Sequence, residues 1–148
     1  MNKEEILTRY SILSKQEKNI QKYIDSIIQY NLHTNLVGKS TLADPWSKHI
    51  LDSLQLISFI KNKSHSILDM GTGAGLPGVV LSIVGYKNIS LVDSNGKKIK
   101  FLKRIKDDLG LDLNIILGRL EKIHNLKFDI ITSRALAKLN ILFGYSQN

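Results

Sequence analysis

The 148-residue sequence contains no cysteine. This absence excludes disulfide bonds, thiolate metal sites and a cysteine nucleophile. No apolar run approaches the roughly 18 residues that a membrane-spanning helix needs. The first ten residues, MNKEEILTRY, lack the apolar segment of a secretory signal peptide. We therefore expect a cytoplasmic protein without a membrane anchor.

The length is enough for one modest domain with a real core, and a hydrophobic content of 43% is ordinary for a globular protein. The formal net charge of +8 suggests a polyanionic partner. A generally lysine-rich composition without functional meaning explains the same sum. The placement of the charges along the chain is therefore more informative than their total.

The segment from Ser66 to Ile83, SILDMGTGAGLPGVVLSI, organises the rest of the chain. A short apolar run ends at an acidic position, a glycine-rich turn follows, and a second apolar run begins. This order is typical of a strand, a tight loop and a helix. Glycine permits unusual backbone angles and leaves no side chain between the backbone and a ligand, while the helix would point its free N–H groups at that ligand. We predict a site for a nucleotide-like cofactor.

Two cofactors fit this segment. GAGLPG at 73–78 matches the dinucleotide fingerprint G-x-G-x-x-G, with Asp93 downstream as a ribose-binding acid. DMGTGAG at 69–75 resembles the first motif of methyltransferases that use S-adenosylmethionine (AdoMet). An acid beside the loop, Asp69, would repel phosphates but suits the ammonium group of AdoMet. The pattern favours AdoMet and leaves NAD as the alternative.

Two amphipathic helices are expected before this segment. Ser14 and Glu17 form a capping box sequence, followed by apolar residues at helical spacing: Ile20, Tyr23, Ile24, Ile27 and Ile28. Residues 31–40 are polar and predict a loop. Asp44 and Pro45 then begin a second helix, whose apolar stripe consists of Trp46, Ile50, Leu54 and Ile57. Both stripes predict core packing.

His49, Asp52 and Ser53 fall within one turn of the second helix. Three residues on one turn cannot arrange a nucleophile, a base and oxyanion donors around one reacting atom. We therefore expect a structural or loop-positioning role for them.

From residue 64 onward, strands and helices alternate. Strands are predicted at 66–70, 89–93, 113–117 and 128–132, and helices at 77–84, 96–109 and 119–124. Alternation of this kind predicts an α/β fold with a parallel, doubly wound, Rossmann-like sheet. We expect residues 1–63 to form an N-terminal helical extension that packs on an AdoMet-binding core at 64–148.

Ligands of such sheets bind at the carboxyl ends of the strands, where four segments are expected to meet: 69–75, Asp93, 118–121 and 133–134. Asp93 is placed to accept both ribose hydroxyls of an adenosine. Leu120 and Glu121 are placed to contact its adenine. Simple helix capping at Asp93 and a solvent-facing Glu121 are the structural alternatives.

The predicted helix at 96–109 carries a basic face. Lys97, Lys100, Lys103 and Arg104 lie off its apolar stripe, which consists of Phe101, Leu102, Ile105 and Leu109. Contact with an RNA phosphate backbone and an ordinary solvated helix face explain this pattern equally well.

The chain also lacks residues that two kinds of base methylation need. Methylation at pyrimidine C5 needs a cysteine nucleophile. In known families, methylation of an exocyclic amine uses an Asn/Asp-Pro-Pro-aromatic turn after the fourth strand. The corresponding residues here, 132–136, read TSRAL and contain no proline. A ring nitrogen such as guanine N7 has an in-plane lone pair and needs only alignment, so no catalytic side chain is required. Arg134 is placed to contact a phosphate, guanine O6 or the cofactor carboxylate.

Six segments occur in an order that resembles the RsmG family, also called GidB, of bacterial 16S rRNA guanine-N7 methyltransferases. They are NLV (35–37), KHILDSL (48–54), ILDMGTGAGLPG (67–78), LVDSNGKKIKFL (91–102), GRLE (118–121) and ITSRALAKL (131–139). The resemblance covers nearly the whole chain.

The resemblance implies AdoMet as the cofactor, 16S rRNA in an assembling small-subunit particle as the partner and no metal. We also expect a monomer. The positions that match the cofactor-binding pattern, together with Asp93 and the loop residues above, give the expected cofactor set: Asp69, Gly71, Gly73, Gly75, Leu76, Asp93, Leu120, Glu121 and Arg134.

The family pattern continues beyond the SRALA motif to a seven-stranded sheet, whereas this chain ends at Asn148. We expect a sheet that is incomplete at its C-terminus, with a helix beginning at 139–145 and an exposed apolar edge on the fourth strand. An inactive remnant that retains RNA or cofactor binding, and a nicotinamide-dependent oxidoreductase, are the alternative functions.

Overall fold

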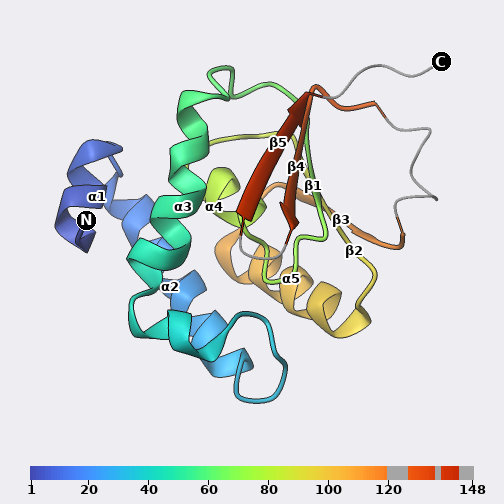
Figure 1. Ribbon diagram of the computed structural model, residues 1–148, viewed down its shortest axis with the longest axis horizontal. Coiled ribbons are helices and arrows are strands. Elements are labelled where there is room, and N and C mark those ends of the chain that lie inside the picture. The colour runs from blue at the N-terminus through green and yellow to red at the C-terminus, as the bar shows by residue number, and fades with distance from the viewer. Residues whose placement is uncertain (120–126, 136–137, 144–148) are drawn as a thin grey trace.

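A computed structural model describes residues 1–119, 127–135 and 138–143. Its centre is a five-stranded sheet with the order β3-β2-β1-β4-β5 (Figure 1). The first four strands are parallel, and β5 pairs antiparallel with β4. The strands are β1 (Ile67–Met70), β2 (Ile89–Asp93), β3 (Leu113–Leu117), β4 (Ile130–Ala135) and β5 (Lys138–Phe143).

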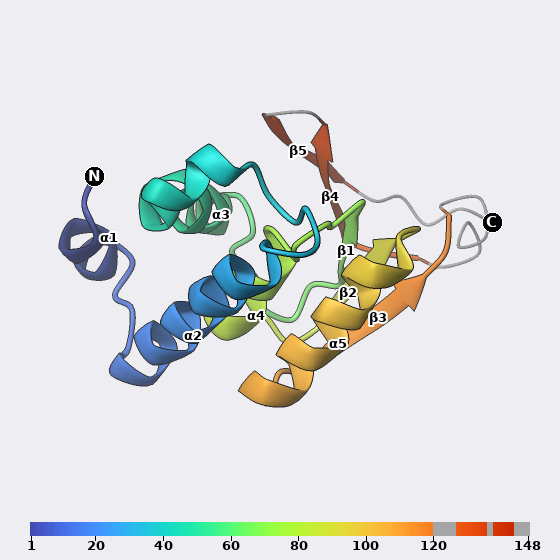
Figure 2. The same ribbon diagram turned by 90° about the horizontal axis from the view of Figure 1, so that it is seen from below.

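The helices confirm the Rossmann-like topology. Because β1, β2 and β3 follow one another in one direction, right-handed crossovers place α4 (Gly78–Ile83) and α5 (Gly96–Leu109) on the same face of the sheet. Helix α2 (Ser14–Tyr30) packs against both of them, beside α4 (Figure 2). The buried apolar residues of the N-terminal helices, α4, α5 and the sheet form one continuous core.

The boundaries predicted for β2, β3 and α5 agree with the structure, because each segment has its own local stop signals. At α5, the Asn95 side chain accepts hydrogen bonds from the backbone N–H groups of Lys97 (3.0 Å) and Lys98 (3.3 Å). Gly110 then ends the helix with a left-handed φ of 62°. The helix predicted at 119–124 lies largely outside the described residues.

The end of the chain departs from the prediction. Residues 138–143 form the strand β5 instead of the beginning of a helix, and they pair with β4 from Ala135↔Lys138 to Ile130↔Phe143. The exposed edge expected on β4 is therefore covered. A parallel strand with unpaired N–H and C=O groups is a strong template for another strand, and this long-range pairing overrides the local helical signal.

The start of α2 also differs by one residue. The backbone N–H of Leu13 donates to Gln16 Oε1 at 2.9 Å, so the predicted capping box of Ser14 and Glu17 does not form. Glu17 instead pairs with Lys3 Nζ at 3.1 Å, on the short helix α1 (Lys3–Arg9). The apolar stripe of α2 is buried as predicted, apart from the exposed Ile28.

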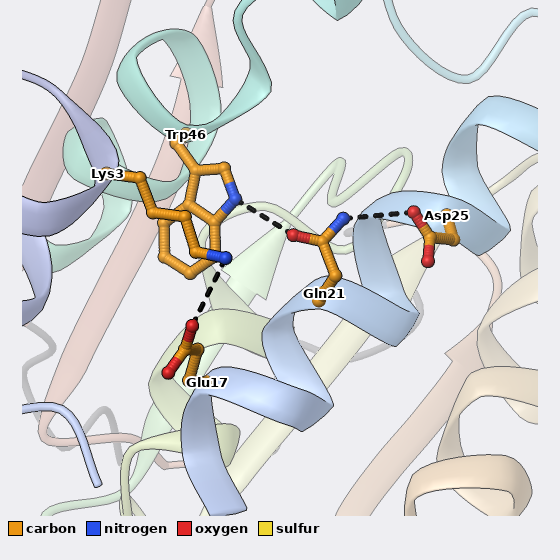
Figure 3. Close-up of polar contacts among 5 residues, drawn as sticks. All are labelled: Lys3, Glu17, Gln21, Asp25 and Trp46. Atoms are coloured by element: carbon orange, nitrogen blue, oxygen red, sulfur yellow. Dashed lines mark hydrogen bonds and ion pairs between the residues drawn. The ribbon is translucent and has the colours of Figure 1, made fainter. Parts of the chain in front are cut away.

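The second predicted helix exists as a continuous set of turns. It consists of a π-helical turn (Trp46–Ile50), α3 (Leu51–Leu54) and a 3-10 turn (Gln55–Ser58), and a separate 3-10 turn (Lys39–Ala43) precedes it. Its anchor is Trp46, which is 7% exposed. The indole Nε1 donates to Gln21 Oε1 at 3.2 Å, and Lys3 Nζ lies 5.1 Å from the ring centroid (Figure 3). These contacts join the helix to α1 and α2.

Within the described ranges, no helix is long and apolar enough to cross a membrane. The expected division of the chain after residue 63 stays a prediction.

Candidate functional site

The glycine-rich loop leaves the carboxyl end of β1, between its neighbours β2 and β4. The strand order reverses at β1, which makes this the switch point where α/β sheets bind ligands. Two hydrogen bonds fix the loop against β2: Thr72 N donates to Val92 O at 3.1 Å, and Gly73 N donates to Asp93 Oδ2 at 2.9 Å. The predicted meeting of the loop with Asp93 is therefore confirmed.

Asp69 lies beneath the loop and has no exposed surface. Its Oδ2 accepts hydrogen bonds from Thr72 Oγ1 (2.7 Å) and Gly78 N (2.9 Å), and its Oδ1 accepts from Thr132 Oγ1 (3.0 Å). The carboxylate thus joins β1, the loop, the first residue of α4 and β4. It accepts the N–H of the first residue of α4, at the helix end that the sequence had suggested would face a ligand, so Asp69 holds the loop in place.

The glycines of the loop fall into two pairs. Gly71 and Gly73 have left-handed φ values of 60° and 58°, and a Cβ on either would meet no atom within 4 Å. A Cβ on Gly75 would lie 2.4 Å from Val79 Cγ2 and 2.8 Å from Leu102 Cδ2. A Cβ on Gly78 would lie 2.2 Å from Leu91 Cδ2. The first pair leaves room for a ligand, and the second pair permits close packing.

Helix α2 contacts the loop directly. The buried Tyr23 hydroxyl donates to Ala74 O at 2.7 Å, across 51 residues of sequence. The sequence identified Tyr23 as a core residue and gave no signal for this hydrogen bond, because the spacing of a helical stripe does not show where a hydroxyl points.

Neighbouring strands complete the site. Asp93 is half-buried at the end of β2, where its Oδ1 accepts from Asn95 N at 2.9 Å and its carbonyl accepts from Gly118 N at 3.0 Å. This brings the segment after β3 to Asp93. Leu120 and Glu121 lie outside the described residues.

Arg134 lies near the carboxyl end of β4. The register pairs Ser133 with Met70, so Arg134 follows immediately at the edge where Gly71 follows Met70. The backbone therefore places Arg134 at the same edge of the sheet as the loop.

A cleft of about 600 Å³ opens above the loop. One wall consists of five loop residues, which include the predicted Gly71, Gly73 and Leu76. The opposite wall comes from the N-terminal region and consists of Leu36, Val37, Gly38, Thr41, Lys48 and His49. Sequence reasoning assigned this wall to a loop and a packing helix, although the NLV and KHILDSL segments that supply it carried a signal through the family resemblance.

His49 positions this second wall. It is 4% exposed, and its Nε2 lies 2.7 Å from Thr41 Oγ1, which donates to Gly38 O at 2.6 Å. The imidazole and the threonine hydroxyl therefore share a hydrogen bond that ties the helix to the turn at Gly38. Ser53 Oγ donates to the His49 carbonyl at 2.9 Å, within the helix. The expected positioning role of this cluster fits these contacts.

The basic residues predicted to contact RNA are exposed on α5. Lys97, Lys100, Lys103 and Arg104 all face solvent, while Phe101, Leu102 and Ile105 are buried. Arg104 Nε lies 3.7 Å from Asp108 Oδ2, so this cation is partly balanced by an acid that the sequence analysis did not count. The three lysines are absent from the ion pairs found among the described residues.

Comparison with known proteins places this geometry in a family. A model of the family GidB, rRNA small subunit methyltransferase G, matches residues 16–148. The proteins named ribosomal RNA small subunit methyltransferase G are similar to this chain in sequence. The one from Paramagnetospirillum magneticum is 36% identical over 99% of this chain and 71% of its own length. The one from Rickettsia prowazekii is 38% identical over 88% of this chain and 68% of its own length. The one from Rickettsia rickettsii is 41% identical over 81% of this chain and 62% of its own length.

Solved structures support the fold. The crystal structure of a mutant of MtNAS in complex with S-adenosylmethionine matches 90% of this chain and 51% of its own with a TM-score of 0.55 and 19% identity. The YcgJ protein from Bacillus subtilis matches 58% of this chain and 38% of its own with a TM-score of 0.52 and 23% identity. On the evidence of the sequence match, which covers most of its length, the chain belongs to the rRNA small subunit methyltransferase G (GidB) family.

Proposed function

We propose that this protein is an AdoMet-dependent methyltransferase that methylates guanine N7 in 16S ribosomal RNA. The observation that carries the proposal is the open pair Gly71 and Gly73, held at the switch point beside Asp93, in a chain of this family. The relatives are named for ribosomal RNA, which supports a nucleic acid as the substrate.

The residues at the site suit AdoMet. A left-handed glycine pair without side chains lets a ligand approach the backbone. Asp93 is half-buried at the adjacent strand end, where a carboxylate accepts hydrogen bonds from ribose hydroxyls. We assign Gly71, Gly73, Leu76 and Asp93 to the cofactor, together with Leu120, Glu121 and Arg134. We assign Gly75 and Asp69 to support of the loop, because both are enclosed by protein atoms.

AdoMet supplies an electrophilic methyl group on a sulfonium. Guanine N7 carries an in-plane lone pair, so the protein has no proton to remove before transfer. The work of the chain is then to hold the base in line with the methyl group and to exclude water, which is catalysis by positioning. The cleft agrees with this mechanism, because the Nε2 atom of His49 is already hydrogen-bonded to Thr41 and is not needed as a base.

The proposal includes the RNA partner and its setting. Lys97, Lys100 and Lys103 present an exposed cationic face next to the cofactor end of β2, which suits phosphate contacts. We further propose that the protein acts as a monomer, in the cytoplasm, on 16S rRNA within an assembling small-subunit particle.

The test begins with calorimetry of the purified chain against AdoMet, with NAD as the control ligand. We expect micromolar binding of AdoMet and none of NAD. Transfer of a labelled methyl group to 16S rRNA, mapped by mass spectrometry, should then give one methylated guanine. Binding of NAD in place of AdoMet would revive the oxidoreductase. Binding of AdoMet and RNA without transfer would favour a binding remnant.

The basic face is tested by Lys97→Glu with Lys100→Glu. We expect weaker RNA binding and an unchanged dissociation constant for AdoMet, because both residues lie outside the cleft. The matched control is the charge reversal Lys87→Glu, at the amino end of β2 and at the far end of the sheet from the loop. Equal losses in the two variants would argue against a specific contact by α5.

A further inference from the structure

The N-terminal wall of the cleft carries a positive charge on a residue that is not among those assigned to the cofactor. Of the eleven described residues that line the cleft, none is acidic, and Lys48 is the one with a permanent positive charge. The nearby carboxylates lie outside this lining: Asp69 and Asp93 are held by hydrogen bonds from the loop and its neighbours, and Asp44 and Asp52 lie one helical turn before and after Lys48. The cleft therefore favours an anion on this side.

Lys48 is free to bind that anion. It is exposed, and among the residues that the structure describes the ion pairs are Lys3 with Glu17 and Arg104 with Asp108. No aromatic ring covers it in the same part of the chain, in contrast to Lys3 and Lys63, which lie over Trp46 and Tyr86.

The backbone that carries Lys48 is held firmly. On one side of it in sequence, Trp46 is anchored to Gln21, which in turn donates to Asp25 Oδ1 at 3.0 Å (Figure 3). On the other side, His49 is buried and bonded to Thr41. A lysine on a fixed backbone at the mouth of a cleft loses less freedom on binding than one on a mobile loop.

We infer that Lys48 is the residue that holds a phosphate of the RNA strand next to the target base, on the wall opposite the glycine loop. The inference rests on the proposed function. The other anion within reach of this wall is the carboxylate of the cofactor. The RNA is favoured because the N-terminal wall faces the loop across the cleft, so the acceptor enters between them, and because Arg134 stands at the loop edge as the partner proposed for the cofactor.

The experiment measures two affinities of the full chain, for AdoMet by calorimetry and for a 16S rRNA transcript by filter binding at several salt concentrations. The variant is Lys48→Ala, with Lys48→Arg as the conservative variant and Lys87→Ala as the matched control. Lys87 is an exposed lysine before β2, at the opposite end of the sheet. All are first compared by urea unfolding, and exposed positions of this kind are expected to leave stability unchanged.

We expect Lys48→Ala to weaken RNA binding about fivefold and to make the slope of log affinity against log salt shallower by about 0.7 to 0.9, the value of one phosphate contact. The AdoMet dissociation constant should stay the same. Lys48→Arg should restore RNA binding, and Lys87→Ala should change neither affinity nor slope.

Two results would overturn the inference. A loss of AdoMet affinity with an unchanged RNA salt slope would assign Lys48 to the cofactor carboxylate. No change in either affinity would show that Lys48 binds neither. Since both readouts are binding constants, they are independent of methyl transfer, and failure of the proposed activity in the unmodified chain would be seen separately.

Discussion

The first half of the glycine-rich segment, Gly71–Gly73, and its second half, Gly75–Gly78, differ in what surrounds them although the same residue type recurs. The first half faces the cleft, and added side-chain atoms would meet nothing within 4 Å. The second half lies where α2, α4, α5 and β2 converge, and added atoms would overlap with Val79, Leu102 or Leu91. The first, outer half therefore borders open space in the cleft, and the second, inner half is part of the packed core.

The polar groups that support the loop from the core side are also hydrogen-bonded. Asp69, Thr72 and Thr132 form a closed set of hydrogen bonds below the loop, and Tyr23 binds Ala74 O from the side. Buried polar groups that are all satisfied give rigidity and a unique arrangement. This comparison predicts that substitutions in the inner half act on stability, and substitutions in the outer half act on binding.

The largest effect is expected from Gly75→Ala. The new Cβ overlaps with two side chains, and the φ of 97° is unfavourable for alanine. Strain and overpacking together should lower the free energy of unfolding by about 3–5 kcal/mol. Urea unfolding followed by circular dichroism measures this change. A variant with native stability would show that the inner half has room, and the comparison would fail.

Asp69→Asn should lower the free energy of unfolding by about 2–4 kcal/mol. Both carboxylate oxygens accept hydrogen bonds, and the amide NH2 of asparagine would place a donor against a donor at one of them. Asp93→Asn is the matched control at the next strand end, where the acid is half-buried. We expect Asp93→Asn to cost less stability and to weaken AdoMet binding at least tenfold. Equal losses of stability would show that Asp69 and Asp93 support the fold to the same extent.

Tyr23→Phe removes only the hydroxyl that donates to Ala74 O. The buried carbonyl loses its partner, so the free energy of unfolding should fall by about 1–2 kcal/mol. The loop keeps its other contacts, and the AdoMet dissociation constant should change by less than about threefold, which is under 1 kcal/mol. A much larger loss of binding at native stability would mean that α2 controls the cofactor directly.

Gly73→Ala sharpens the comparison in the outer half. At a φ of 58° alanine pays only backbone strain, about 1 kcal/mol of unfolding free energy. Gly110→Ala is matched to it, since Gly110 has a φ of 62° and equally open surroundings but caps α5 away from the cleft. Both should lose similar stability, and only Gly73→Ala should abolish detectable AdoMet binding. Retained AdoMet binding in Gly73→Ala would show that the cofactor does not contact this half of the loop.

The smallest effect concerns the opposite end of the sheet. Ser66 donates to Asp129 Oδ2 through its backbone N–H (2.9 Å) and its hydroxyl (3.2 Å), which lowers the pKa of Asp129 below its ordinary value. A lowered carboxyl pKa adds stability above the unfolded pKa, and this is lost as the pH falls through the folded pKa. Thermal unfolding between pH 7 and about pH 3 should show a slightly smaller acid-induced loss for Asp129→Asn than for the unmodified chain. A larger loss would contradict this assignment.

Local patterns were enough to predict much of the fold. The apolar periods of α2 and α5 and the strand-loop-helix order around the glycines all act within a few residues. The parallel order followed because right-handed crossovers leave few alternatives. The convergence of the loop, Asp93 and the segment after β3 followed from the same rule.

Other features depend on partners that are distant in sequence. Residues 139–143 read as a helix alone, but the open edge of β4 draws them into β5. The N-terminal wall of the cleft was not recognised, because only the folded chain brings Thr41, Lys48 and His49 opposite Gly71 and Gly73.

The sequence by itself determined the family, through the resemblance of six ordered motifs. It also determined the order of the elements and the place of the glycine loop at a strand end, since these depend on short-range spacing. Only the tertiary structure decided which glycines face the cleft, that Asp69 supports the loop from below, and that Lys48 stands across from it. The physical reason is that a residue's role depends on the atoms around it, and here those atoms come from α2, α5, β4 and the turn at 39–43.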